Sequence, residues 1–512
     1  PAPPLDKVYF TNFSAPNLQS TERMFYKPTK MRFVKLEGIL HNIKVSKLIT
    51  MKEMFYICKN LANITIENIE FLELTNMERM FEQCDYINNI TFRNLNFTKL
   101  TLMNNTFYNN YGAKKFYLEN INAEKLISME EMFLNSYCIE EILITNFKAP
   151  NLKSMKKMFS YCNNLKKVKL EGLLQNINIS NVISMEEMFS QCYFLDNFIL
   201  QNITFTELTN MERMFEHCEK LINVTFQNLD FDKSISMKDM FVRCDSLNNV
   251  SFQNINLSKT LILKKILKEN SRLLYVNFEN IDASEAIEIE NICSGVIIPE
   301  LHFKNIKIPK ISSVMGLFNN CGNLGNLYLE SIDASQITRI ENIFSSTNLG
   351  NISFININIS KATLIKGLFK SQYGLNNIIF KNITSDSLFD VSEMFYDSSF
   401  KSLDLSGLDT SKTKIMESMF QFSRGTFLNL SYLDTSSVTN MNKMFSDCYE
   451  LQSLDISNFN TENVETMDYM FNNCKKLEIL NLSSFHTPKL ISIKDMFKAS
   501  SSVKNINLGR FD

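Results

Sequence analysis

The sequence predicts an α/β solenoid of about 19–20 coils, each with one strand of a parallel sheet and one short helix. Two observations predict it. A period of mostly 25 or 26 residues runs along the 512-residue chain, and a helix-like and a strand-like apolar pattern alternate within each period. Such a period is typical of solenoids, because each unit is too small to bury its own apolar face and stacks on its neighbours.

The period is marked by an apolar pair whose consensus is Met-Phe. The second residue of the pair is Phe25, Phe55, Phe81, Phe107, Phe133, Phe159, Phe189, Phe215, Phe241, Leu267, Cys293, Phe318, Phe344, Phe369, Phe395, Phe420, Phe445, Phe471 and Phe497. Because the repeat runs from end to end, we expect one continuous solenoid domain over residues 1–512.

The helix of each coil is predicted from the segment that carries the Met-Phe pair. In SMEEMFSQC, apolar residues fall at i, i+3, i+4 and i+7, namely Met185, Met188, Phe189 and Cys192. This spacing places them on one helix face. Ser184 and Glu187 have the spacing of a capping box, as do Thr50 and Glu53.

The strand of each coil is predicted from the segment that follows, such as LDNFILQNI at 195–203, whose central residues alternate between apolar and polar. Stacked strands lie about 4.8 Å apart, whereas packed helices need about 9 Å. The mismatch predicts a curved body with the sheet on the concave face and the helices on the convex face.

A recurrent Asn lies near the end of the predicted strands. It is found at Asn12, Asn68, Asn94, Asn120, Asn146, Asn202, Asn228, Asn254, Asn280, Asn305, Asn356, Asn382 and Asn458. We interpret this column as an Asn ladder whose amides bond the backbone of adjacent coils where the chain leaves the strand.

An internal duplication shows that the chain grew by whole coils. Residues 11–97 match 145–231 at a constant offset, as in LTNMERMFEQC and LTNMERMFEHC. A five-coil block was copied as a unit, which suits a molecule whose contacts are made between nearest neighbours. The coils at about 261–311 are degenerate, since LILKKIL and IEIENIC replace the Met-Phe motif there.

The segment from Leu433 to Phe485, LDTSSVTNMNKMFSDCYELQSLDISNFNTENVETMDYMFNNCKKLEILNLSSF, resembles the BspA-type leucine-rich repeats and their pattern LxxLDLSxFxTxxVxxMxxMFxxC. The resemblance extends over the chain and is loosest between Leu261 and Ile311. It implies a leucine-rich-repeat protein of the cell surface or extracellular space with a role in adhesion, matrix binding or surface architecture. It implies no enzyme activity.

The residues themselves indicate no catalytic, cofactor-binding or metal site. Only four His occur, and GxGxxG, P-loop, HExxH, GxSxG and CxxC motifs are absent. The formal net charge of -2 gives no reason to expect nucleic acid as a partner. No stretch approaches the roughly 18 consecutive apolar residues of a membrane span. We therefore expect a protein that is not an enzyme and has no cofactor.

Most of the eleven cysteines occupy one position, three residues after the Phe of the motif. On neighbouring helices this position would recur about every 9 to 10 Å, which is too far for a disulfide. We interpret these cysteines as small buried hydrophobes that close each coil.

Candidate binding residues point outward from the centre of each predicted strand. On the concave face they include Lys35, Thr65, Thr91, Tyr117, Lys169, Thr225, Ser251, His302 and Tyr328. Candidate N-glycosylation sites, each in an Asn-x-Ser/Thr sequon, are Asn96, Asn178, Asn256, Asn358, Asn63, Asn89, Asn223 and Asn249.

Two functions remain open from the sequence. The first is adhesion or recognition of a protein or glycan ligand on a cell surface or matrix. The second is a structural subunit of a surface filament, coat or matrix, because predicted strands at both ends lack polar capping units and head-to-tail stacking of identical chains would cover them. Both place the protein outside the cell or on its surface.

Overall fold

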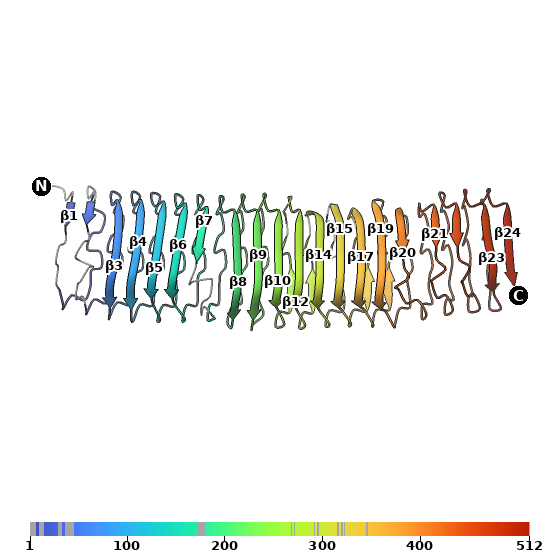
Figure 1. The fold of residues 1–512 in the computed structure, drawn as a ribbon, viewed down its shortest axis with the longest axis horizontal. Coiled ribbons are helices and arrows are strands. Elements are labelled where there is room, and N and C mark those ends of the chain that lie inside the picture. Colours follow the sequence, from blue (N-terminus) through green and yellow to red (C-terminus); the bar gives the residue numbers. More distant parts are fainter. Residues whose placement is uncertain are drawn as a thin grey trace. The chain divides into compact units, whose positions relative to one another are not determined.

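The computed structural model describes residues 7–9, 15–28, 33–35, 46–170, 180–267, 269–270, 272–290, 292–293, 296–314, 317–318, 321, 323–344 and 347–510. The chain forms two compact units, Pro1–Thr260 and Leu261–Asp512. The single domain expected over residues 1–512 stays a prediction. In each unit the strands lie side by side in chain order and pair in parallel (Figure 1).

The first unit contains a five-stranded sheet, β3 to β7, and the paired strands β8, β9 and β10. Its strands are β1 (Lys7–Tyr9), β2 (Phe33–Lys35), β3 (Asn63–Phe71), β4 (Asn89–Phe97), β5 (Lys115–Asn122), β6 (Glu141–Lys148), β7 (Lys167–Leu170), β8 (Asn197–Phe205), β9 (Asn223–Phe231) and β10 (Asn249–Asn256).

In the second unit, β12, β14, β15, β17, β19 and β20 pair in that order. Its strands are β11 (Ile262–Lys264), β12 (Tyr275–Asp282), β13 (Glu288–Glu290), β14 (Ile297–Lys307), β15 (Asn323–Asp333), β16 (Arg339–Glu341), β17 (Leu349–Asn358), β18 (Leu364–Lys366), β19 (Leu375–Thr384), β20 (Phe400–Asp404), β21 (Phe427–Asn429), β22 (Ser453–Asp455), β23 (Ile479–His486) and β24 (Asn505–Arg510).

Each coil has a sheet side, formed by its long strand, and a turn side, formed by the segment with the Met-Phe motif. The solenoid predicted from the repeat is confirmed, but the predicted helices are wrong. The described residues contain no helix, and the Met-Phe segments are successive turns. The fold is a parallel β-solenoid and not an α/β solenoid.

Backbone geometry explains why turns replace the helix. Glu187 and Gln191 have φ of 52° and 63°, values in the left-handed region that a right-handed helix does not contain. The N–H of Glu187 donates to the carbonyl of Glu212 in the next coil, whereas the N–H of Met188 closes a turn onto Met185. Hydrogen bonds therefore alternate between the next coil and the same turn.

The sequence pattern was misleading because two four-residue turns in succession produce the apolar spacing of a helix. Met185, Met188 and Phe189 are all fully buried, as a helix would also have placed them. Ser184 does not cap a helix; its Oγ accepts a hydrogen bond from the N–H of Glu186, two residues on. Spacing thus identified the buried positions correctly and their backbone conformation wrongly.

Equal spacing on the two sides removes the reason to expect concave and convex faces. On the turn side of the first unit, rings of neighbouring coils stack 5.1 Å (Phe55 and Phe81) to 5.7 Å (Phe189 and Phe215) apart. On the sheet side, Phe71 and Phe97 stack at 5.1 Å. Turns of neighbouring coils are spaced almost as closely as strands. The mismatch expected between packed helices and paired strands is therefore absent in this unit.

The Met-Phe residues form the core, as predicted. Phe189 and Phe215 are fully buried, and Phe198 of β8 meets the ring of Phe215 edge-on at 4.9 Å. Leu267 and Cys293 of the degenerate coils are also fully buried. In those coils the motif segment contains the short strands β11 and β13. Among the described residues, no helix is long and apolar enough to cross a membrane.

Candidate functional site

The Asn ladder predicted from the sequence runs along the sheet side. Nδ2 of Asn94 donates to Oδ1 of Asn68 (2.8 Å), and Nδ2 of Asn120 donates to Oδ1 of Asn94 (2.9 Å). The ladder is thus confirmed, with one correction: these amides lie exposed and bond each other and not the backbone. Asn458 bonds as predicted, since its Nδ2 donates to the carbonyl of Ser431 (2.8 Å). Asn94 has a φ of 53°, which Asn tolerates better than most residues. Asn12 lies outside the described residues.

In the first unit, the outward-facing candidates form rows without a cluster of one chemistry. Strand register aligns Thr65, Thr91 and Tyr117 on neighbouring strands, followed by Leu143 and Lys169. In a second row, Thr225 lies opposite Ser251. Lys35 lies on β2, opposite Tyr9. These rows mix hydroxyl, apolar and charged groups.

In the second unit, His302 and Tyr328 are register partners on β14 and β15, and their rings stack at 4.5 Å. Tyr275 of β12 brings a third ring, 5.3 Å from His302. Nε2 of His302 lies 2.7 Å from Oε1 of Glu300. These four residues form the aromatic cluster, and the Tyr328 residue is 38% exposed.

Sequence reasoning found two members of the aromatic cluster and missed Tyr275 and Glu300. Both missed residues lie two positions before the predicted column, so they share its face because strand side chains alternate. A search of every outward-facing position would have found them. Burial raises the pKa of Tyr275, and the carboxylates of Glu300 and Glu279 raise it further.

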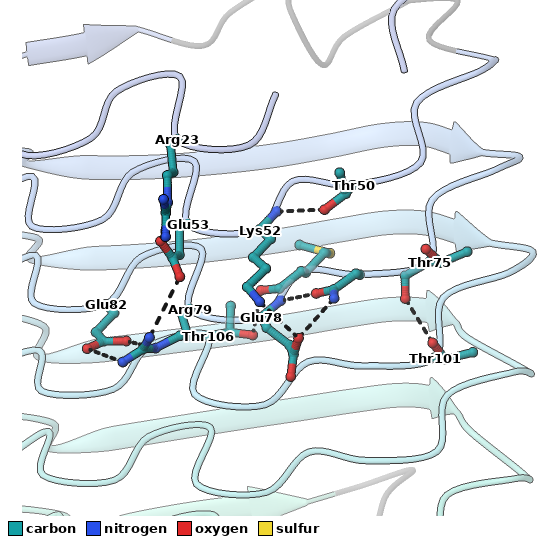
Figure 2. Close-up of polar contacts among 12 residues, drawn as sticks. Arg23, Thr50, Lys52, Glu53, Thr75, Glu78, Arg79, Glu82, Thr101 and Thr106 are labelled. Carbon is teal, nitrogen blue, oxygen red and sulfur yellow. Dashed lines mark hydrogen bonds and ion pairs between the residues drawn. The ribbon is translucent and has the colours of Figure 1, made fainter. Parts of the chain in front are cut away.

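The turn side of the first unit holds the charge cluster, Arg23, Glu53, Arg79 and Glu82 (Figure 2). Nε of Arg23 donates to Oε2 of Glu53 (2.7 Å). Nη1 of Arg79 lies 3.6 Å from Oε1 of Glu53, and Nε of Arg79 donates to Oε2 of Glu82 (2.6 Å). The Glu53 and Glu82 residues are only 4% and 2% exposed. Burial raises the pKa of Glu82, while Arg79 opposes the rise.

Aromatic rings beside the charge cluster complete it. Tyr26 and Tyr56 stack at 5.0 Å, and the guanidinium of Arg79 lies 5.6 Å from the centre of the Tyr56 ring. Arg23, Glu53 and Arg79 all have positive φ, which strains the backbone of a non-glycine residue. Their charges alternate from one coil to the next. The carboxylates of the charge cluster are saturated by their own arginines, which suits stability better than ligand binding.

Nine cysteines have a role that the sequence interpretation missed. The expected distance of 9 to 10 Å between their positions is wrong, because the turn sides stack about as closely as strands. Sγ of Cys218 donates to the carbonyl of Phe189 (3.1 Å) in the preceding coil. Asn110 and Ser136 take the same place and bond the carbonyls of Phe81 and Phe107. The position therefore often combines a donor with a small buried side chain, although Val296 fills it with a purely apolar one.

The candidate glycosylation sites lie on the sheet side or just beyond it. In five of them Nδ2 donates to a side chain of the neighbouring coil: Asn96, Asn256, Asn358, Asn223 and Asn249. Asn89 is exposed on β4, Asn63 lies on β3, and Asn178 lies outside the described residues. Their glycosylation stays a prediction.

The chain matches the model of one protein family along most of its length. The model of a family described as Mycoplasma protein of unknown function, DUF285, matches residues 19–141, 101–221, 128–254, 196–298, 289–402, 312–428 and 389–511. The chain belongs to the DUF285 family. No curated protein matches this DUF285 chain.

Among solved structures, this DUF285 chain is similar to the crystal structure of a leucine-rich repeat protein from Bacteroides ovatus ATCC 8483. The two chains are 16% identical with a TM-score of 0.37, over 85% of this chain and 91% of that one.

Proposed function

We propose that this DUF285 chain is a non-enzymatic recognition protein of the cell surface or extracellular space, which binds a protein or glycan through its sheet side. The observation that carries the proposal is the aromatic cluster of the second unit. Aromatic side chains with polar tips are enriched in binding hot spots because they offer large contact area with hydrogen-bonding groups. Strands fix their positions before binding, which lowers the entropic cost.

The placement on the cell surface is supported by the sequence pattern. The segment from Leu433 to Phe485 resembles the BspA-type leucine-rich repeats, which are found in surface proteins. Membership of that specific family, and a role in adhesion, are part of the proposal. The contrast with the charge cluster also supports it, since the buried carboxylates there are satisfied internally, whereas the aromatic cluster is open to solvent.

Binding measurements with two matched variants test the proposal. The purified chain is applied to a panel of immobilised matrix proteins and to a glycan array, as wild type, Tyr328→Ala and Tyr117→Ala. Tyr117 lies at the equivalent strand position in the first unit, so it controls for the loss of any outward-facing tyrosine. We expect Tyr328→Ala to weaken binding at least tenfold and Tyr117→Ala to change it less than twofold.

Two results would overturn the proposal. One is binding that Tyr328→Ala leaves unchanged, and the other is the absence of any bound protein or glycan on both panels. Surface labelling of intact cells tests the location, and a chain protected from labelling until the cells are lysed would contradict it. Regular linear assemblies in electron micrographs, with both panels negative, would favour the structural subunit instead.

A further inference from the structure

The row of side chains that contains His302 and Tyr328 has a step in it. Strand register aligns six outward-facing positions on neighbouring strands: Asn277, His302, Tyr328, Ser353, Ile379 and Asp404. Ser353 is the smallest of the six. The residues on either side of it, Tyr328 and Ile379, are 38% and 40% exposed. A short side chain therefore separates two large, exposed ones. We call the space above Ser353, between Tyr328 and Ile379, the step.

The ring of Tyr328 has one covered and one open face. His302 stacks on it at 4.5 Å with an interplanar angle of 22°. The opposite face points along the sheet toward β17, where the register partner is Ser353. Tyr328 and Ile379 are two strands apart, which corresponds to about 9.6 Å. That distance leaves room for one ring above Ser353, at the spacing that His302 already adopts.

Neutral amides border this step on one side. Nδ2 of Asn351 donates to Oδ1 of Asn326 (2.7 Å), and Nδ2 of Asn377 donates to Oδ1 of Asn351 (2.9 Å). These residues lie two positions before Tyr328, Ser353 and Ile379 on the same strands, so they share the same face. Each amide group can donate two hydrogen bonds and accept two. The bonds among Asn326, Asn351 and Asn377 therefore leave donors and acceptors for a ligand.

We infer that the step over Ser353 binds one sugar ring of a neutral glycan. This inference rests on the proposed function and names the ligand class of that surface. A pyranose presents an apolar C–H face, which the negative face of an aromatic ring attracts. Its hydroxyl groups both donate and accept hydrogen bonds, as the amides beside Ser353 do.

The border chemistry favours a glycan over an aromatic side chain of a protein partner. An aromatic side chain would fill the step, but it carries at most one polar group against the several hydroxyl groups of a sugar. It would therefore cover the amide of Asn351 at a cost in unpaired polar groups. The amide of Asn351 on one border of the step carries no charge, and Glu300 already contacts His302. On the other border Glu330 and Lys381 lie on the same face with opposite charges, so this border also has no net charge. A neutral ligand with many hydroxyl groups satisfies these conditions.

Filling the step tests the inference. Ser353→Phe supplies the missing ring itself, and stacked Phe pairs between neighbouring strands occur in this sheet, as Phe354 and Phe380 show at 4.6 Å on its inner face. Ile199→Phe is the matched control, because it adds a ring at the equivalent outward-facing place on β8. On an array of neutral glycans we expect Ser353→Phe to weaken binding at least tenfold and Ile199→Phe to stay within twofold of wild type.

Ile379→Ala removes the far wall without adding bulk, and we expect it to weaken glycan binding three- to tenfold even if Ser353→Phe folds poorly. Glycan binding that survives both substitutions would overturn the inference. Protein binding that Tyr328→Ala abolishes, with no neutral glycan bound, would also overturn it and leave the proposed function standing. Binding of either class that Tyr328→Ala leaves unchanged would instead remove the proposed function.

Discussion

The turn side and the sheet side of this solenoid use the same stacking distance for different purposes. On the turn side, Phe189 and Phe215 are fully buried and Glu53 is held between two arginines. On the sheet side, the Asn ladder and the ring of Tyr328 lie exposed. We infer that the buried rings and buried carboxylates of the turn side supply most of the stability of the stack. The outward-facing residues of the sheet side can therefore differ from coil to coil.

The sharpest way to break this comparison is to delete one ring on each side. Phe215 stacks on Phe189 and Phe241 and meets Phe198 edge-on. We expect Phe215→Ala to lower the free energy of unfolding by about 3–5 kcal/mol, because it leaves a cavity in the core. Tyr328→Ala should change it by less than about 0.5 kcal/mol.

Urea unfolding followed by far-UV circular dichroism and tyrosine fluorescence measures both variants, since the chain contains no Trp. Equal losses for the two substitutions would contradict the division between a stabilising turn side and an accessible sheet side.

The next effect compares a buried with an exposed ion pair. Glu53→Gln leaves the guanidinium groups of Arg23 and Arg79 without the carboxylate between them, and we expect a loss of about 2 kcal/mol. Glu73→Gln is the control, because Glu73 and Lys99 pair at 2.6 Å with side chains 42% and 53% exposed. Its expected cost is about 0–0.5 kcal/mol. The same urea titration would contradict the comparison if the control cost as much.

A smaller effect concerns the backbone of the sheet side. Asn94 has a φ of 53°, a left-handed conformation that Asn tolerates better than Ala does, so Asn94→Ala should cost about 1–2 kcal/mol. Asn94→Gly also loses the amide ladder but accepts this φ, and should cost less than the alanine variant. Equal unfolding midpoints would show that the amide bonds, and not the backbone, make Asn necessary there.

Much of this fold follows from the sequence because burial has a simple period. The core residues, the strand positions and the Asn column were all predictable from the positions of Phe189, Leu200 and Asn202 and their repeats. The turns were not predictable, because Met185, Met188 and Phe189 have helical spacing. The positive φ of Glu187 breaks the helix, but the residue type gives no sign of it. Glu is not typical of that conformation.

The candidate site was only half predictable for a related reason. His302 and Tyr328 were found because one outward-facing column was read coil by coil. Tyr275 contacts His302 diagonally across two strands, at 5.3 Å, and a diagonal contact depends on ring orientation as well as register. The open face of Tyr328 depends on the small size of Ser353 in the next coil, which gains meaning only when the register is known.

The smallest expected effect tests whether burial or pairing dominates in the charge cluster. Burial raises the pKa of Glu82 in the folded protein, despite Arg79. A raised pKa means that the fold favours the protonated carboxyl, so this contribution to stability is complete below the pKa of the unfolded chain and is lost as pH rises through the folded value.

Glu82→Gln removes the titrating group but keeps an acceptor for Arg79. Relative to this variant, the wild type should therefore lose stability as pH rises above the ordinary pKa of a glutamate carboxyl, by less than Asn94→Ala costs. Thermal unfolding at several pH values measures the difference. A wild type that instead gains on the variant as pH rises would show that the ion pair with Arg79 outweighs desolvation, and that the turn side depends on its charges as well as on its rings.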